Sequence, residues 1–136
     1  MVLTRGRTLS ALIVVLVLAV GSMAVHSRKS LPSDVAARCN GSVAEVEFGA
    51  LMGRSRLVRI RYRISADPPV MYEVTADSWL SVDPALPCPT TARLTVNAGD
   101  VWGGDTECWI EVNEVRVVEM QTRRREQCNV VVRLFQ

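Results

Sequence analysis

The residues that could carry chemistry in this sequence are few. The chain of 136 residues has four cysteines and a single histidine. That histidine, His26, follows an apolar run and has no cysteine or carboxylate cluster beside it, so we interpret it as a solvated residue rather than a base or a metal ligand. The sequence has no C-x-x-C motif and no clustered histidines, which argues against a metal site. We therefore predict no metal and no cofactor.

Two groups of polar residues have the composition of a catalytic pair. Asp77 precedes Ser78, and Asp100 lies close to Asp105. General acid–base catalysis needs a raised carboxyl pKa and a cleft, and neither pattern indicates them. Serine catalysis would lack its base, because the single histidine, His26, directly follows an apolar run that we expect to enter a membrane. We therefore predict no catalytic residues and no enzymatic activity.

An apolar run over residues 9–25 determines which compartment the rest of the chain occupies. It has no charged residue and follows Arg5 and Arg7. As a helix it would extend about 25 Å, slightly short of a hydrocarbon core of about 30 Å, so it could span a membrane if the flanking arginines snorkel. A signal peptide cleaved after Ala24 is the alternative, because residues 22–24 form a small-residue cleavage site.

The four cysteines all lie after the apolar run, as Cys39, Cys88, Cys108 and Cys128. Disulfides persist outside the cytoplasm, so this distribution favours an extracytoplasmic C-terminal part. Four cysteines allow three pairings. We favour Cys108 with Cys128, because each lies on the apolar face of its expected strand and the two strands are near in sequence. This choice leaves Cys39 with Cys88.

The expected domain organisation follows from the apolar run. We predict a cytoplasmic tail over residues 1–8, a transmembrane helix or signal peptide over residues 9–25, a linker over residues 26–38 and an extracytoplasmic β domain over residues 39–136. A last segment of about a hundred residues suits one small domain. Basic residues flank the apolar run, which leaves this domain slightly acidic and makes nucleic acid a poor partner.

Apolar residues recur at every second position from Ser42 onward, which is the period of a strand with one buried face. The clearest strand covers residues 57–64. We expect a turn over residues 49–56 before it and a proline-rich crossing over residues 83–89 after it. Several short strands without an amphipathic helix pattern predict an all-β domain built as a β-sandwich.

Arg59, Arg61 and Arg63 share the polar face of the strand over residues 57–64. A row of arginines could bind an anion or a lipid headgroup. Cross-strand charge pairs are ordinary in antiparallel sheets, however, and Glu45 and Glu47 would oppose the row across the expected hairpin. We therefore interpret the row as a solvated face balanced by carboxylates.

The segment NAGDVWGGDTECWIEVNEV, residues 97–115, together with Cys128 resembles the closing part of the mycobacterial membrane protein small (MmpS) family. The shared features are a Gly-Asp turn, a cysteine that opens a strand of alternating apolar residues, a Val-Asn step into the next strand, and a second cysteine near the chain end. The layout of tail, membrane helix, linker and small β domain is similar as well. Cys39 and Cys88 are additional to the family pattern, and Asn113-Glu114 stands where the family usually has Asn-Gly or Asp-Gly.

The resemblance implies an immunoglobulin-like β-sandwich in which Cys108 and Cys128 are disulfide-bonded. It also implies a membrane-anchored accessory protein beside a resistance-nodulation-division transporter that exports lipids or siderophores. We therefore expect a single-pass cell-membrane protein with an extracytoplasmic domain, a transporter partner and a lipidic ligand. The alternative is a free secreted β-sandwich binding module released by signal peptidase.

Tryptophan is the residue type that we use to locate a binding surface, because it is enriched at hot spots and is rarely fully buried. The candidates are Trp79, Trp102 and Trp109. Trp109 is opposite in phase to Cys108, so it should face outward unless a second layer covers it. For all three tryptophans the alternative is a position in the core or at its rim.

Overall fold

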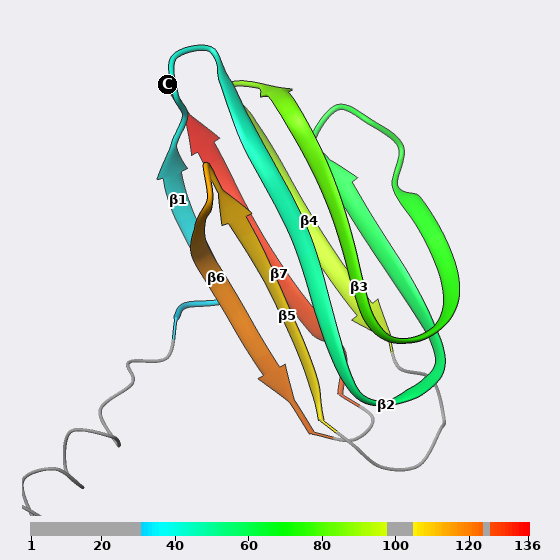
Figure 1. Ribbon diagram of the computed structural model, residues 1–136. Coiled ribbons are helices and arrows are strands. Elements are labelled where there is room, and N and C mark those ends of the chain that lie inside the picture. Colours follow the sequence, from blue (N-terminus) through cyan, green and yellow to red (C-terminus); the bar gives the residue numbers. More distant parts are fainter. Residues whose placement is uncertain (1–30, 98–104, 124–125) are drawn as a thin grey trace, which may run out of the picture. The chain divides into compact units, whose positions relative to one another are not determined.

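The computed structural model describes residues 31–97, 105–123 and 126–136, with the backbone alone for residues 54–56. This part of the chain is all-β, as predicted (Figure 1). Its strands are β1 (Asp34–Arg38), β2 (Val43–Ile64), β3 (Val70–Pro87), β4 (Thr90–Asn97), β5 (Thr106–Val112), β6 (Val115–Thr122) and β7 (Cys128–Phe135). Within the described residues no helix is long and apolar enough to cross a membrane, and the apolar run over residues 9–25 lies outside them.

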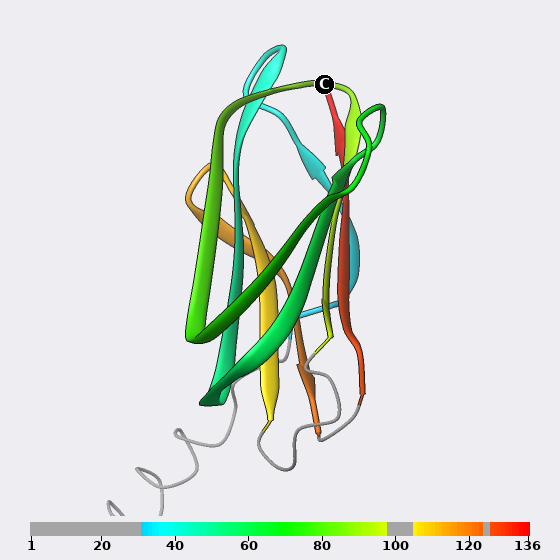
Figure 2. The same cartoon turned by 90° about the vertical axis from the view of Figure 1, so that its right-hand side faces the viewer.

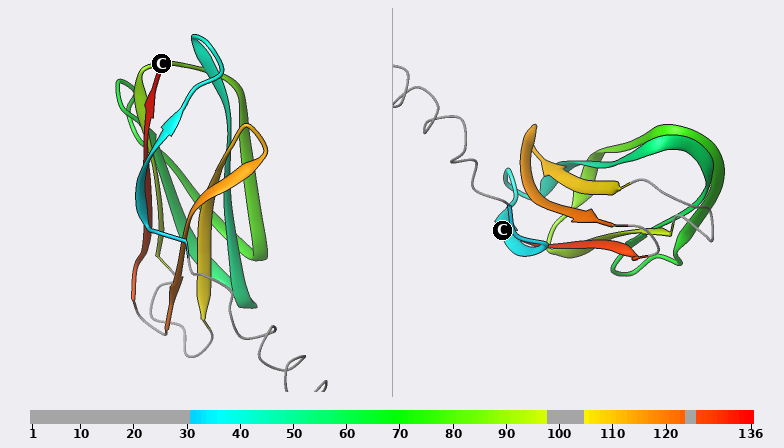
Figure 3. Two further views of the ribbon diagram at one scale, coloured as in Figure 1. Left: turned by 90° about the vertical axis from the view of Figure 1, so that its left-hand side faces the viewer. Right: turned by 90° about the horizontal axis from the view of Figure 1, so that it is seen from below.

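The seven strands form one sheet in the order β1-β7-β4-β2-β5-β6, with β3 paired to β2 outside this path. All pairs are antiparallel except β1 with β7. The sheet curls until its two ends approach each other. A hydrogen bond joins these ends, since the N–H of Glu119 on β6 donates to the carbonyl of Pro32, just before β1, at 3.0 Å. The described strands therefore enclose a nearly closed, flattened barrel, which Figure 3 shows end-on.

β2 is longer than the sequence suggested, because it continues through the turn expected over residues 49–56. Its first part pairs with β5, from Val46 to Met52, and its last part pairs with β4, from Arg59 to Ile64. Figure 2 shows both strands of the β2–β3 hairpin bending sharply at the same level. The turn prediction is wrong because this segment bends across a register irregularity instead of reversing direction.

Two further expectations are corrected by the strand pairing. The proline-rich crossing over residues 83–89 is strand as far as Pro87. Among the described strands β3 pairs only with β2, and its unpaired edge tolerates proline because it needs no N–H donor. Pro84 lies where the β2–β3 register shifts, so its missing N–H does not remove a hydrogen bond from the regular β2–β3 pairing. The predicted linker over residues 26–38 includes Asp34–Arg38, but this segment forms β1 along β7.

The interior of the barrel is filled mainly by the alternating apolar residues of β2, β4, β5 and β7. Even-numbered residues of β2 from Ala44 to Met52 and from Val58 to Ile60 are buried, as are Ala92, Leu94 and Val96 of β4. Both predicted disulfides are confirmed. The Cys108–Cys128 bond joins β5 to β7, strands that are not neighbours in the sheet, and so crosses the interior. The Cys39–Cys88 bond ties the end of β1 to the β3–β4 connection.

The turn between β5 and β6 consists of Asn113 and Glu114, because Val112 pairs with Val115. Both turn residues have positive φ, 49° and 67°. Two-residue hairpins prefer this left-handed conformation, and glycine is the usual second residue. Asn113 also fixes the turn to β2, since its Oδ1 accepts from the Glu45 N–H at 3.1 Å. Glu114 therefore carries backbone strain that a glycine would avoid.

We expect Glu114→Gly to raise the free energy of unfolding by about 0.5–1 kcal/mol, because glycine adopts positive φ without a Cβ clash. Urea unfolding followed by tryptophan fluorescence measures the change. Glu114→Ala is the matched control, since it removes the same carboxylate but keeps a Cβ. Equal stabilisation by alanine would show that charge, not backbone conformation, is responsible.

The disulfides allow a second stability prediction. In the chain-entropy model a disulfide stabilises by lowering the conformational entropy of the unfolded chain, and the effect grows with the length of the loop that it closes. The sequence separations are 20 for Cys108–Cys128 and 49 for Cys39–Cys88. We expect the double variant C108A/C128A to lose about 3 kcal/mol and C39A/C88A about 4 kcal/mol in urea unfolding. A loss below about 1 kcal/mol in both variants would contradict this account.

Candidate functional site

Trp109 faces outward from β5, as its phase predicts, yet it is only 6% exposed. Its cross-strand neighbour on β2 is Gly49, and a Cβ built on Gly49 would overlap the indole ring. The indole thus lies flat over the backbone of β2. On its other side the guanidinium carbon of Arg116, from β6, lies 4.1 Å from a ring centroid. The ring is covered from both sides, and Arg116 forms the covering layer.

Arg116 is held over this ring by three glutamates. Its guanidinium lies 3.3 Å from Glu107, 3.5 Å from Glu111 and 3.5 Å from Glu119. All four side chains are partly buried, so the cation–π contact is stronger than at an open surface. Within the described residues the Trp109 Nε1 atom is buried without a hydrogen-bond partner. This cluster closes the outer face of β5 and β6 and leaves little of Trp109 open to a partner.

Trp79 lies on the opposite, inner side of the β2–β3 hairpin, in a cluster of four aromatic rings. Phe48 and Tyr62, both on β2, stack with centroids 5.0 Å apart. Tyr72 and Trp79, both on β3, are 5.9 Å apart, and each lies near Tyr62. Burial and the Tyr72 hydroxyl raise the pKa of Tyr62 above its ordinary value. Trp79 therefore fills the concave side of the bent hairpin, as a residue at the rim of the core.

The other residues singled out from the sequence are either exposed or outside the part of the chain that the structure describes. Trp102, Asp100 and His26 lie outside the described residues. Asp77 and Ser78 are exposed on β3, and Asp105 is exposed just before β5. No group of three or more metal-ligating side chains occurs in the part of the chain that the structure describes.

An exposed apolar patch lies on the outer face of the β2–β3 hairpin, beside Gly49. Leu80 is paired with Gly49 and is 60% exposed, and Val82 on the same face is 52% exposed. Leu51 of β2 is 46% exposed next to them. Among the described strands β3 pairs only with β2, so its other edge presents free backbone groups to a partner. We call these three residues with the β3 edge the apolar patch.

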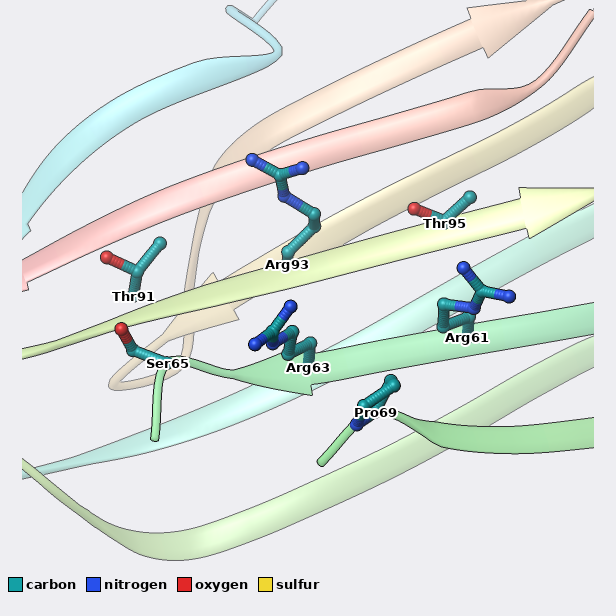
Figure 4. Close-up of a pocket in the computed structure, with 7 residues that line it drawn as sticks. All are labelled: Arg61, Arg63, Ser65, Pro69, Thr91, Arg93 and Thr95. Atoms are coloured by element: carbon teal, nitrogen blue, oxygen red, sulfur yellow. The ribbon is translucent and has the colours of Figure 1, made fainter. Parts of the chain in front are cut away.

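A groove of about 460 Å³ lies on the outer face of β2 and β4 (Figure 4). Its lining residues are Arg61, Arg63, Ser65, Pro69, Thr91, Arg93 and Thr95, and we call them the arginine groove. Figure 4 shows the Arg61 and Arg63 side chains on β2 beside those of Thr91, Arg93 and Thr95 on β4. Ala92, Leu94 and Val96 of β4 are buried. The residues that alternate with them, Thr91, Arg93 and Thr95, therefore face outward. The groove therefore combines three guanidinium groups with three hydroxyl groups.

The balancing carboxylates expected for the arginine row are not at this site. Glu45 and Glu47 lie on the first part of β2, where Glu47 pairs with Val82 and Glu111. Within the described residues, Arg59 alone in this row has a carboxylate partner, Glu73 on β3 at 3.3 Å, and this pair is well exposed. The expected balance was wrong because it depended on a hairpin that β2 does not form.

Sequence reasoning identified the arginines of β2 but missed the residues that β4 contributes. The signal was present, since Thr91, Arg93 and Thr95 alternate with buried apolar residues and so share one polar face. Nothing in the local pattern, however, places this face beside Arg61 and Arg63. The register that joins them pairs residues about thirty positions apart, as Arg63 with Arg93 shows.

No family model, no curated protein and no solved structure matches this chain.

The Trp109 cluster generates the prediction for this site. Gly49→Ala is expected to lower the free energy of unfolding by about 1–3 kcal/mol, because the new methyl group must displace the indole ring. Urea unfolding measures the loss. In a Trp109→Ala background the same substitution should cost almost nothing, and this double-mutant cycle isolates the contact. An equal loss in both backgrounds would mean that the strand backbone, not the ring, excludes alanine.

Proposed function

We propose that this chain is an exported, membrane-anchored binding protein without enzymatic activity. The observation that carries the proposal is that all four cysteines close into two disulfides within the β domain. Such bonds persist in oxidising compartments and are rare in the cytosol. The apolar run over residues 9–25 precedes the domain and would serve as its single membrane span.

The binding role is supported by the apolar patch. Monomeric proteins seldom leave large apolar side chains clustered along an unpaired strand edge, because both features invite association. Leu80 and Val82 are each more than half exposed on such an edge. A domain held beside a membrane would meet partners with apolar surfaces there, and we propose that a membrane-protein partner docks along β3.

The finer proposal concerns the partner. The resemblance of residues 97–115 and Cys128 to the MmpS family supports an accessory role beside a resistance-nodulation-division transporter, with lipid or siderophore as the exported cargo. It also supports the proposal that the curled sheet is a variant of the immunoglobulin-like β-sandwich. Trp102, within this segment, belongs to the candidate contact surface of that proposal.

The alternative function is a free secreted binding module, released by cleavage after Ala24. It would use the same apolar patch and the same disulfides. The specific feature that favours it is the small-residue sequence at positions 22–24. The two functions differ in whether the mature protein keeps residues 9–25.

Expression of the full chain in a host with export machinery tests the proposal. We expect a membrane-bound product of full mass whose four cysteines resist alkylation until a reductant is added. Intact-mass measurement of the membrane and soluble fractions, with and without alkylation, gives both readouts. A C39A/C88A/C108A/C128A variant is the control for background alkylation.

The other outcomes separate the alternatives. A soluble product shortened by about 24 residues, as the cleavage site predicts, would support the secreted module and contradict the anchor. Cysteines that alkylate freely in the native protein would contradict export itself.

A further inference from the structure

The arginine groove is a feature that the proposed function does not explain. In the β2–β4 ladder Arg63 lies directly opposite Arg93, and Arg61 is next along the same face of β2. Like charges at directly opposed positions destabilise an antiparallel pair. This arrangement therefore weakens the sheet while it concentrates positive charge in one groove.

Among the described residues, no neighbouring carboxylate compensates the charge of these three arginines. Arg133 has Asp34 at 3.1 Å, and Arg59 has Glu73 at 3.3 Å. In the described part of the chain no carboxylate lies within 4.0 Å of the three guanidinium groups of the groove.

Arg61 differs from Arg59 and Arg133 in the kind of group that its guanidinium contacts. Its Nε lies 2.9 Å from the thioether sulfur of Met71, which is only a weak acceptor and brings no negative charge. Its guanidinium therefore keeps its charge for a ligand.

We propose that the arginine groove is a binding site for a phosphate-bearing ligand, with a monoester phosphate as the best-fitting group. Arginine presents a planar fork of donors that matches phosphate oxygens in pairs. Three guanidinium groups and the hydroxyls of Ser65 and Thr91 supply more donors than the two oxygens of a carboxylate can accept, whereas the Thr95 hydroxyl already donates to Asn129 Oδ1 at 3.2 Å. A phosphate monoester has more oxygens and carries a charge closer to that of the groove.

The shape of the groove is consistent with this ligand. Its volume of about 460 Å³ lies within the range of small-molecule sites, and it lies open on the outer face of the sheet. Pro69 provides a rigid apolar wall at one side (Figure 4). The phosphate could therefore belong to a soluble phosphoester or to the headgroup of a membrane lipid, since both present the same group.

Titration of the purified full chain with glycerol phosphate, followed by calorimetry, tests the proposal. We expect saturable binding that Arg63→Gln and Arg93→Gln each weaken by about tenfold or more, the loss of one charge-assisted contact. Acetate at the same concentrations should bind at least about tenfold more weakly than glycerol phosphate, because it offers fewer oxygens.

Arg59→Gln is the matched control. It removes the same charge from the same face of β2, but Arg59 lies outside the groove and is already paired with Glu73. Its effect on binding should stay below about twofold, the scale of screened surface charge. Loss of binding in Arg59→Gln equal to that in Arg93→Gln would overturn the site, because net surface charge would then explain the result.

Thermal unfolding without any ligand gives an independent readout. Arg93→Gln removes the like-charge pair, so we expect its unfolding midpoint to rise by roughly 1–5 °C. Arg59→Gln removes a carboxylate-paired charge and should not raise the midpoint. A lower midpoint in Arg93→Gln would overturn the claim that the groove is held against its own repulsion.

Vesicles identify the source of the phosphate. Phosphatidylcholine vesicles with and without phosphatidic acid are compared with glycerol phosphate. Binding to the phosphatidic acid vesicles alone assigns a lipid headgroup, whereas binding of glycerol phosphate in solution assigns a soluble phosphoester. Absence of binding to both probes overturns the proposal. These measurements use purified protein, so they are independent of whether the chain is anchored or secreted.

Discussion

The bend in β2 is the constraint on which the rest of the structure depends. One strand pairs with β5 along its first part and with β4 along its last part, so it carries the sheet from one side of the barrel to the other. A bent hairpin leaves space on its concave side. Four aromatic rings fill that space: Phe48, Tyr62 and Tyr72 are stacked in sequence, and Trp79 packs at a tilt against the two tyrosines. Aromatic pairs of this kind add stability beyond the area that they bury.

The same bend divides the outer face of β2 into regions of different chemistry. The first region bears Glu45 and Glu47 and adjoins the Trp109 cluster and the apolar patch. The second bears the arginine row and faces β4. Because the strand bends and does not fold back on itself, the acidic region never opposes the basic one. The separation of charge on the surface is thus a consequence of topology.

Much of the interior could be predicted from the sequence, because it depends on local alternation. The period-two pattern identified the buried phase of β2, β4, β5 and β7, and the shared phase of Cys108 and Cys128 indicated their bond. The pattern does not distinguish a strand that reverses from one that bends. Gly49 looked like part of a turn, and only the position of Trp109 shows that it makes room for an indole ring. The parallel pairing of β1 with β7 is equally invisible locally, since its partners are about a hundred residues apart.

The candidate site was predictable only in part, for the same reason. The row of Arg59, Arg61 and Arg63 is a local pattern, and its outward direction followed from the buried residues between them. Whether the row is neutral depends on its neighbours across the sheet. Arg59 has Glu73 as its neighbour on β3. On β4, Arg61 lies opposite Thr95 and Arg63 lies opposite Arg93. The charge of a strand face is therefore a property of register, which the sequence of one strand does not contain.

Three features of the described domain work against its stability, and they differ in how they are offset. Glu114 has a positive φ that a short hairpin demands, and Asn113 beside it is bonded to β2 in return. The buried Nε1 of Trp109 lacks a partner, but the ring is stacked under Arg116 and three glutamates hold that arginine.

The opposed pair of Arg63 and Arg93 has no such compensation among the described residues. The two disulfides make the domain stable enough to tolerate it, since each closes a loop of the unfolded chain. Tolerance does not explain why the pair is there, because a single neutral residue would remove the repulsion. An anion that binds between the two guanidinium groups turns the same repulsion into affinity, and this is the physical reason to regard the groove as a site.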